Sequence, residues 1–428
     1  MEIVILVLSF IILLGIGVPI AWSIGLSSVF TMLVSIPALP AFTTVAHRMA
    51  SGIDSFALLA IPFFILAGQI MNRGGIAKRL IAFARTLVGA LPGGLAHVNI
   101  IAAMLFGAIS GSAVAAASAI GSFMTDEMRK EGFTKEFAAA VNITSSTTGL
   151  VIPPSNVLIV YSLASGGASI AALFLAGYLP GILTGLFLMA VAGIWATRKG
   201  HKVGKISPLV QTWKTFWQAF PSLLLLVVVI GGIVAGIFTA TEASAVAVLY
   251  SLILTFLYGE VSIKELPDIF LQSVATTAIV MLLIGTSMSM SWIMAYENIP
   301  QNITAFLLSI SENKIVILLI INLILLFVGI FMDMTPAVLI FTPIFLPVVT
   351  ALGMDPVHFG IIMVLNLTIG ICTPPVGSVL FVGVGVAGTT IQKVIRPLLP
   401  LFIAMLVALV LTTYIPALSL WLPQKFGF

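Results

Sequence analysis

The sequence predicts an all-α polytopic membrane protein, because of its composition, its long uncharged stretches and an internal repeat. Of 428 residues, 60% are hydrophobic and 7% are charged, whereas a soluble domain carries about 25% charged residues because its surface faces water. Apolar stretches of about 20 residues, the length that crosses a bilayer, recur along the chain. The first, Ile3 to Val34, contains no charge. It is too long, and lacks the basic flank, for a cleavable signal peptide.

The same composition excludes several kinds of site. The single cysteine, Cys372, excludes a disulfide within the chain and a multi-cysteine metal site. The four histidines are scattered without the spacing of metal ligands, and no Gly-rich phosphate loop of the Walker type is present. The net charge of +4 comes from basic residues in short loops between apolar segments, so it indicates membrane topology rather than nucleic-acid binding.

An internal repeat divides the chain into two halves of about 200 residues each. Pro153-Pro154 aligns with Pro374-Pro375 at a shift of 221 positions. Other matches follow in order at the same shift: Gly132 with Gly353, Thr147 with Thr368, and Gly149 with Gly370. An ordered series of this kind indicates that the two halves share one structural plan.

The basic residues indicate that the halves have opposite orientations. Arg73 to Arg85 is rich in Arg and Lys, but the stretch Tyr296–Leu308, which aligns with it at a shift of 223, has none. Arg129 to Lys135 aligns with Thr350–Pro356, which again has none. Since Lys and Arg mark cytoplasmic loops, the pattern predicts an inverted-topology repeat, with a binding site near the bilayer midplane between its halves.

Two segments at the duplicated prolines are predicted to leave the helical conformation. They are SSTTGLVIPPSN, Ser145 to Asn156, and LTIGICTPPVG, Leu367 to Gly377. A Pro-Pro pair removes two backbone donors and cannot continue a helix. Freed carbonyls and nearby hydroxyls suit a hard cation such as Na⁺, and the positive end of the next half-helix suits an anion. The alternative is a helix kink satisfied by neighbouring Ser and Thr side chains.

A second duplicated pair is predicted to form helical hairpins, Gly107–Gly121 and Gly329–Pro343. The first has its tip at Ser110-Gly111-Ser112, and the second holds Asp333 and Thr335 at its tip. A re-entrant hairpin and two full crossings with a short loop both fit the first segment. Asp333 lies deep in an apolar run, and intramembrane carboxylates are costly and usually functional. Small-residue helix packing is the alternative for the Ser/Ala run, and a structural role is the alternative for Asp333.

The remaining charged segments receive structural interpretations. Gly75–Val88 alternates basic and apolar residues at helical spacing, which predicts an interfacial helix on the cytoplasmic surface. Its repeat partner, Ile299–Ile310, is expected on the opposite surface, and both could be arms joining a moving part to a fixed part. The basic linker Arg198–Lys214 is expected in the cytoplasm. Glu242 is expected in the first turn of a helix capped by Thr241.

The residues resemble the large membrane subunit of TRAP (tripartite ATP-independent periplasmic) transporters over nearly the whole chain. The resemblance rests on these segments: Leu58 to Leu80 (LLAIPFFILAGQIMNRGGIAKRL), Leu91 to Ala115 (LPGGLAHVNIIAAMLFGAISGSAVA), GLVIPPS from Gly149, GIFTATEASAVA from Gly236, and LTIGICTPPVG. It implies an elevator motion of a transport part against a scaffold part, and two sodium sites related by the inverted repeat.

The resemblance also implies a division of the chain and a set of site residues. Residues 91–165 and 310–388 would form the transport part, and 1–90, 166–309 and 389–428 the scaffold with its arms and linker. One sodium site would use Ser110, Ser112, Gly149, Val151 and Pro153. The other would use Asp333, Thr335, Gly370 and Thr373. Substrate would lie near Ser112, Ser155, Asn156 and Asp333.

One departure from the family pattern concerns an acid. Family members often carry an acid shortly after the SGSAVA stretch, where this chain has Ala115-Ala116. Any role of that acid elsewhere in the family is therefore in doubt here.

The function implied is sodium-driven import of an organic acid across the inner membrane, with no enzymatic activity. Two partners are implied: a small membrane subunit and a periplasmic solute-binding protein. The hydroxyl-rich SSTTG and Ser155-Asn156 favour a polyhydroxylated acid such as sialic acid, followed by a C4-dicarboxylate. One alternative is a stand-alone sodium/dicarboxylate symporter. Another, an intramembrane hydrolase, would rely on His97, which lies 13 positions before Ser110 without an orienting third residue.

Overall fold

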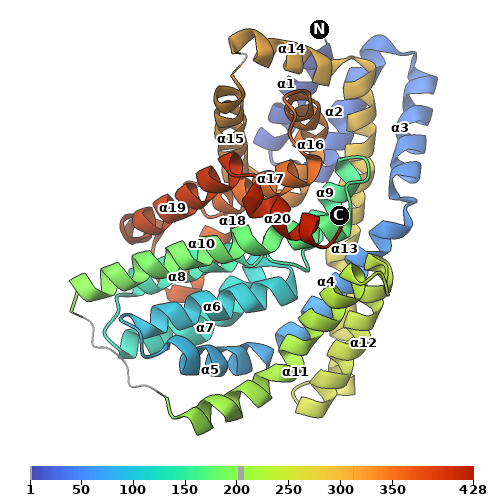
Figure 1. Ribbon diagram of the computed structural model, residues 1–428. Helices are drawn as coiled ribbons and strands as arrows, with labels where there is room; N and C mark the ends of the chain where they lie inside the picture. The colour runs from blue at the N-terminus through green and yellow to red at the C-terminus, as the bar shows by residue number, and fades with distance from the viewer. Residues whose placement is uncertain (1, 201–206, 312) are drawn as a thin grey trace.

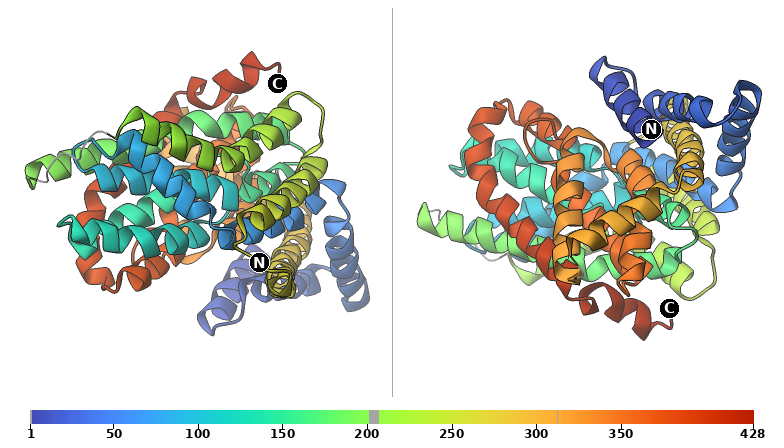
Figure 2. Two further views of the ribbon diagram at one scale, coloured as in Figure 1. Left: turned by 90° about the horizontal axis from the view of Figure 1, so that it is seen from below. Right: turned by 90° about the horizontal axis from the view of Figure 1, so that it is seen from above.

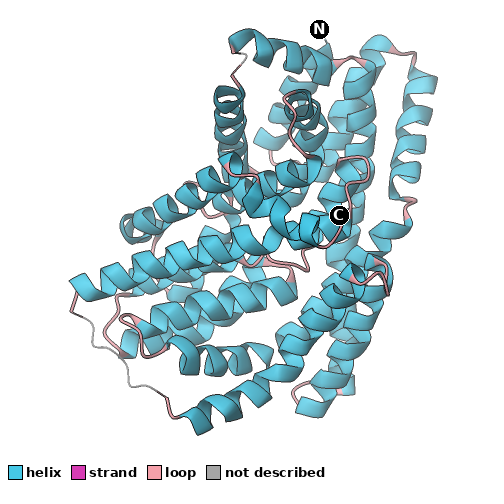
Figure 3. Ribbon diagram, viewed as in Figure 1, coloured by secondary structure: helices cyan, strands magenta, loops and turns pink. Residues whose placement is uncertain are grey.

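The computed structural model describes residues 2–200, 207–311 and 313–428, and in these ranges it consists of helices joined by short loops, without strands (Figure 3). Eight of the described helical segments are long and apolar enough to cross a membrane. The predicted class, an all-α polytopic membrane protein, is therefore confirmed.

The helices fall into two series that follow the two halves of the sequence. The first half contains α1 (Glu2–Gly15), α2 (Ile20–Ser35), α3 (Ala38–Ile53), η1 (Phe56–Leu59), α4 (Ala60–Arg73), α5 (Ile76–Val88), α6 (Gly94–Ser110), α7 (Ala113–Lys130), α8 (Lys135–Thr148), α9 (Asn156–Ala164) and α10 (Ile170–Arg198). The second contains α11 (Leu209–Val234), α12 (Ala240–Tyr258), η2 (Ile263–Glu265), α13 (Leu266–Tyr296), α14 (Ile299–Ile310), α15 (Lys314–Phe331), α16 (Met334–Ala351), α17 (Pro356–Gly370), α18 (Ser378–Ala387), α19 (Ile391–Tyr414) and α20 (Ala417–Lys425).

The internal repeat is visible in the positions of the helices. Helices α7 and α16 begin at residues 113 and 334, and α8 and α17 begin at 135 and 356, so both pairs are 221 positions apart. The turns between them contain Gly132 and Gly353, with φ of 88° and 72°. A side chain is strained in this left-handed region, so the same turn is built twice.

The two predicted arms are present as helices and lie at opposite ends of the molecule. Helix α5 lies near the lower end in Figure 1 and α14 at the upper end. In Figure 2, α5 lies on the near side in the view from below, and α14 lies on the near side in the view from above. The predicted ranges Gly75–Val88 and Ile299–Ile310 match these helices to within one residue. Opposite placement is what an inverted pair of arms requires.

The two repeats interlock through their short half-helices. Helix α9 of the first repeat packs against α16 and α17 of the second, and α18 of the second packs against α7 and α8 of the first. Helices α10 and α19 pack against each other and against α8 and α17. Helices α2, α3, α4, α12 and α13 form a neighbouring group through the contacts of α13 with α2, α3 and α4 and of α4 with α12.

Tyr161 joins the two repeats at one point. Its side chain is fully buried, its ring lies over Gly360 of α17, and its hydroxyl donates to the carbonyl of Pro356 at 2.6 Å. We expect Tyr161→Phe to lower stability by about 1 kcal/mol, since it removes a partly buried hydrogen bond between the two repeats. The measurement is the thermal midpoint of the purified protein in detergent.

Tyr414→Phe is the matched control for this prediction. Its hydroxyl also donates to a carbonyl, that of Ile315 at 2.9 Å, but in an exposed setting. It should change the midpoint little. Equal losses in the two variants would contradict the role assigned to Tyr161.

One detail differs from the sequence-based expectations. Helix α12 is capped by Thr239 rather than by Thr241: the Thr239 hydroxyl accepts from the amide of Glu242, and the Glu242 carboxylate accepts from the amide of Thr239. Thr241 instead donates to the carbonyl of Phe56 at 3.0 Å. The reciprocal pair satisfies two amides at once, which explains the earlier start. The linker Arg198–Lys214 falls partly on residues 201–206, outside the described residues.

Candidate functional site

The tip of the first hairpin is the turn between α6 and α7. Gly111 has φ of 63°, which allows the chain to reverse within two residues. The Ser112 hydroxyl accepts from the amide of Ala115 at 3.2 Å and so caps α7. Gly68 of α4 packs against this tip, because a Cβ there would lie 2.5 Å from the carbonyl oxygen of Ser110. The first tip is therefore held directly against α4.

The tip of the second hairpin is the turn between α15 and α16. Asp333 occupies the position before the first residue of α16, as Ser112 does before α7. The two residues are 221 positions apart, so they are equivalent within the repeat. The start of a helix carries partial positive charge, and both tips direct such a start toward the same region.

The two tips meet at one cavity of about 270 Å³. It lies between α4, α9, α13 and both hairpins, and Asp333 is exposed to it. Among the described residues that line it, none is Lys, Arg or His. The polar side chains on its wall are Gln69, Asn72, Ser110, Ser112, Asn156, Thr276, Asp333 and Thr335.

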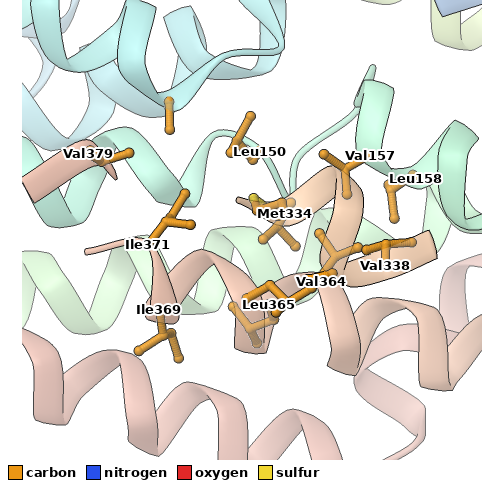
Figure 4. Packing of buried hydrophobic residues seen from close by; sticks show 14 of the residues in the cluster. Leu150, Val157, Leu158, Met334, Val338, Val364, Leu365, Ile369, Ile371 and Val379 are labelled. Carbon is orange, nitrogen blue, oxygen red and sulfur yellow. The ribbon is translucent and has the colours of Figure 1, made fainter. Parts of the chain in front are cut away.

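An apolar layer lies next to the tips. Its side chains come from α9, α16, α18 and the two unwound segments. Leu150, Val157, Met334, Ile371 and Val379 come together there (Figure 4), and all five line a smaller cavity of about 110 Å³ that also touches Ser112 and Asp333. These apolar side chains border the polar tips on one side, while Asp333 stays exposed to the larger cavity.

Both predicted unwound segments are present, and both have a glycine at a close backbone crossing. A Cβ on Gly149 would lie 2.6 Å from Cα of Gly107, and one on Gly370 would lie 2.5 Å from Cα of Gly329. Beyond these crossings the chain is non-helical to Ser155 and Gly377, and the Pro153-Pro154 and Pro374-Pro375 bonds are cis. The glycines bring each hairpin against its own interrupted helix.

Other predicted sodium ligands lie near the tips but not on the cavity wall. The carbonyl of Val151 faces Gly177 of α10. The Thr373 hydroxyl donates to the carbonyl of Ile369 at 2.7 Å, and its carbonyl faces Gly377. Of the predicted sodium residues, the structure brings Ser110, Ser112, Asp333 and Thr335 together on the cavity.

The hydroxyls of the run before Pro153 bond within their own helix. Ser145, Ser146, Thr147 and Thr148 are fully buried, and each donates to a carbonyl of its own helix α8. Such back-bonding satisfies a hydroxyl inside an apolar environment. Ser155 is also buried, and its hydroxyl has no hydrogen-bond partner among the described residues, whereas Asn156 reaches the cavity. The run therefore gives no support to a polyhydroxylated substrate.

The part of the wall formed by α4 and α13 contains none of the predicted site residues. Gln69 and Asn72 lie three residues apart on α4, and Thr276 lies on α13. Two amides at helical spacing in a mostly apolar helix were the signal that could have identified this face. Ala115 also lines the cavity, so one of the two positions without the family's acid faces the site.

His97 lies away from this cavity. Its Nε2 is 2.9 Å from the carbonyl of Pro92, and it is not among the residues lining the site. A hydrogen bond to a neighbouring turn is a structural role for a buried histidine. The geometry therefore gives no support to a hydrolase that combines His97 with Ser110.

The fold and the cavity define a class of protein: a multi-pass membrane permease with duplicated, interrupted helices around one internal site. Residues 7–418 match the family model described as "Tripartite ATP-independent periplasmic transporter, DctM component". The chain belongs to this family and is a large permease subunit of the TRAP type.

Individual relatives are similar over nearly their whole length. The chain is 58% identical to the protein YgiK of Salmonella typhimurium, covering 100% of this chain and 98% of that one. It is 40% identical to the C4-dicarboxylate TRAP transporter large permease protein DctM of Rhodobacter capsulatus, covering 96% of both. It is 41% identical to the sialic acid TRAP transporter large permease protein SiaM of Vibrio cholerae, covering 89% of both.

A solved structure shows the same fold at low identity. The YdaH transporter of Alcanivorax borkumensis matches with a TM-score of 0.66 and 14% identity, covering 91% of this chain and 89% of that one. At this identity the likeness concerns the fold alone. It places the chain's architecture among known membrane transporters.

Proposed function

We propose that this permease imports an organic acid together with sodium ions across the inner membrane, with the acid delivered by a periplasmic binding protein and a small membrane subunit completing the complex. The observation that carries the proposal is the cavity. It is polar, contains the carboxylate of Asp333, and has no basic side chain among the described residues on its wall. An anion beside a carboxylate is repelled by it, and an accompanying cation offsets that repulsion.

Sodium fits the oxygen groups at the tips. Sodium is a hard cation that takes hydroxyl, carbonyl and carboxylate oxygens, and interrupted helices supply them in secondary transporters. Ser110 and Ser112 would hold one ion with carbonyls near Gly149. Asp333 and Thr335 would hold the other with carbonyls near Gly370. No group of three His, Cys, Asp or Glu that could hold a transition metal occurs within the described part of the chain, which is consistent with a site built mostly from neutral oxygens.

The proposed movement is an elevator motion of the hairpins and interrupted helices against α2, α3, α4, α12 and α13. Two features support re-entrant hairpins: both tips line one internal cavity, and the arms α5 and α14 lie at opposite ends of the molecule. Residues 91–165 and 310–388 would form the core of the moving part. Because α10 and α19 pack on α8 and α17, we place these two helices with the moving part, although the sequence pattern assigned them to the scaffold.

The proposed substrate class, an organic acid, is supported by the names of the relatives. Relatives at about 40% identity are named for C4-dicarboxylate and for sialic acid, and both are carboxylates. At about 100 mV each entering sodium contributes about 2.3 kcal/mol from the membrane potential. Two sodium ions with a singly charged acid would therefore move net positive charge inward and be driven by the potential.

The test is uptake of radiolabelled acid into proteoliposomes that hold this chain and its small subunit. Labelled sialic acid and succinate are supplied with and without the periplasmic binding protein, and with and without an inward sodium gradient. We expect uptake of an acid only when both are present. Sodium-dependent uptake without the binding protein would favour a stand-alone symporter, and uptake that ignores sodium would contradict the coupling.

A further inference from the structure

The α4 side of the cavity carries two amide side chains for which no hydrogen bond is found among the described residues. Gln69 and Asn72 lie on one face of α4 and line the cavity beside the first hairpin tip, which packs on Gly68. Each is partly buried. Most of the wall around them on α4 and α13 is apolar, formed by Ile61, Ile65 and Val280. Amides in such a setting are free to bind a ligand.

The positions of the charged groups orient the substrate. The Asp333 carboxylate and the hydroxyls of Ser110, Ser112 and Thr335 belong to the tips, so the accompanying cations and the substrate carboxylate belong there. The other end of the acid then meets the remaining wall of the cavity, whose polar groups include Gln69 and Asn72 of α4. An amide both donates and accepts hydrogen bonds, which matches hydroxyl, keto and acylamino groups.

We propose that Gln69 and Asn72 form a subsite on the fixed scaffold that binds the uncharged polar groups of the acid. The inference rests on the proposed function and adds a chemical requirement: the substrate carries hydroxyl, keto or acylamino groups beyond its carboxylate. An acid with a bare hydrocarbon end leaves both amides unpaired, and a site built to hydrogen-bond such a group rejects analogues that lack it.

The subsite also explains how a preference for a hydroxylated acid can arise without Ser145–Thr148. The hydroxyls of that run donate to carbonyls of α8 instead. The preference for a hydroxylated acid then depends on α4, and on its contact with the first tip at Gly68. Because α4 is placed in the scaffold, these contacts exist only while the tips lie beside it.

The first test compares two acids in the full complex with its binding protein. Uptake of N-acetylneuraminate and of succinate is measured for wild type, Gln69→Leu, Asn72→Leu and the double variant. Each lost hydrogen bond weakens binding about 2- to 10-fold. We expect N-acetylneuraminate uptake at low concentration to fall about 10-fold or more in the double variant. Succinate uptake should fall less, because its second carboxylate only accepts hydrogen bonds from the amides, whereas the hydroxyl and acylamino groups of N-acetylneuraminate also donate to them. Gln272→Leu is the matched control, because Gln272 is exposed on α13 and does not line the cavity.

The second test needs no transport and detects a variant that merely misfolds. The native cysteine, Cys372, is fully buried, so Gln69→Cys and Gln272→Cys can be labelled selectively with a small maleimide. In sodium, N-acetylneuraminate should slow labelling of Gln69→Cys several-fold and leave Gln272→Cys unchanged. Parallel loss of both acids in the double variant, or absent protection while wild type transports N-acetylneuraminate, would overturn the subsite. If the wild-type complex takes up succinate but not N-acetylneuraminate, the subsite is also overturned. If it takes up neither acid, the proposed function is overturned together with the subsite.

Discussion

Asp333→Asn is expected to reduce sodium-driven uptake about 100-fold while leaving the fold intact. The carboxylate is exposed to the cavity at the tip of the second hairpin, and under the proposed function it supplies the negative charge of one sodium site. Asparagine keeps the size and one oxygen but removes that charge. Interactions with a charged group are worth about 3 kcal/mol, which corresponds to about a 100-fold change.

The measurement is the initial rate of uptake over a range of sodium concentrations. Asp333→Asn should need much more sodium and show a shallower sodium dependence, because one of two ions is bound weakly. Asp268→Asn is the control, since Asp268 is exposed in the first turn of α13. Normal sodium dependence in Asp333→Asn would remove this residue from the sodium site.

Gly149→Ala is expected to destabilise the whole transport core. The backbone angle at Gly149, φ of −61°, suits any residue, so the effect is steric. Its Cβ would lie 2.6 Å from Cα of Gly107 and 2.9 Å from the carbonyl carbon. Since backbone atoms at a helix crossing cannot rotate away as a side chain can, we expect a loss of about 3 kcal/mol or more.

The measurement is the thermal midpoint and the yield of monodisperse protein after purification. Gly370→Ala should behave in the same way, because Gly370 makes the equivalent crossing with Gly329 in the second repeat. Gly385→Ala is the control: its Cβ would meet nothing within 4 Å, and alanine favours a helix more than glycine does. A normal midpoint for Gly149→Ala would mean that the crossing is looser than described.

The fold could be predicted because the repeated residues are prolines and glycines, which determine the backbone conformation directly. Pro153-Pro154 and Pro374-Pro375 interrupt helices in any context, and Gly132 and Gly353 allow left-handed turns. The helix boundaries of α7, α8, α16 and α17 follow directly from these positions. The hairpin tips were predictable for a similar reason, since Ser112 and Asp333 stand at equivalent positions and are polar within apolar runs.

The rest of the site depends on tertiary packing that a local pattern does not specify. Ser145 to Thr148 look like ligands in the sequence, but a hydroxyl in a buried helix can bond to its own main chain, and these do. Gln69 and Asn72 come from a helix more than 30 positions before the first tip, and only the packing of Gly68 against Ser110 brings them to the cavity. The Val151 carbonyl faces α10 because of a glycine at position 177.

The most direct test of the central claim is simultaneous flux of ²²Na⁺ and labelled acid into the same proteoliposomes. The claim is that an anion enters this cavity only with sodium, because the described wall offers Asp333 and no basic side chain. We expect each singly charged acid to enter with more than one sodium ion, and an inside-negative potential to accelerate both fluxes. Acid flux that continues without sodium, or that follows a proton gradient alone, would contradict it.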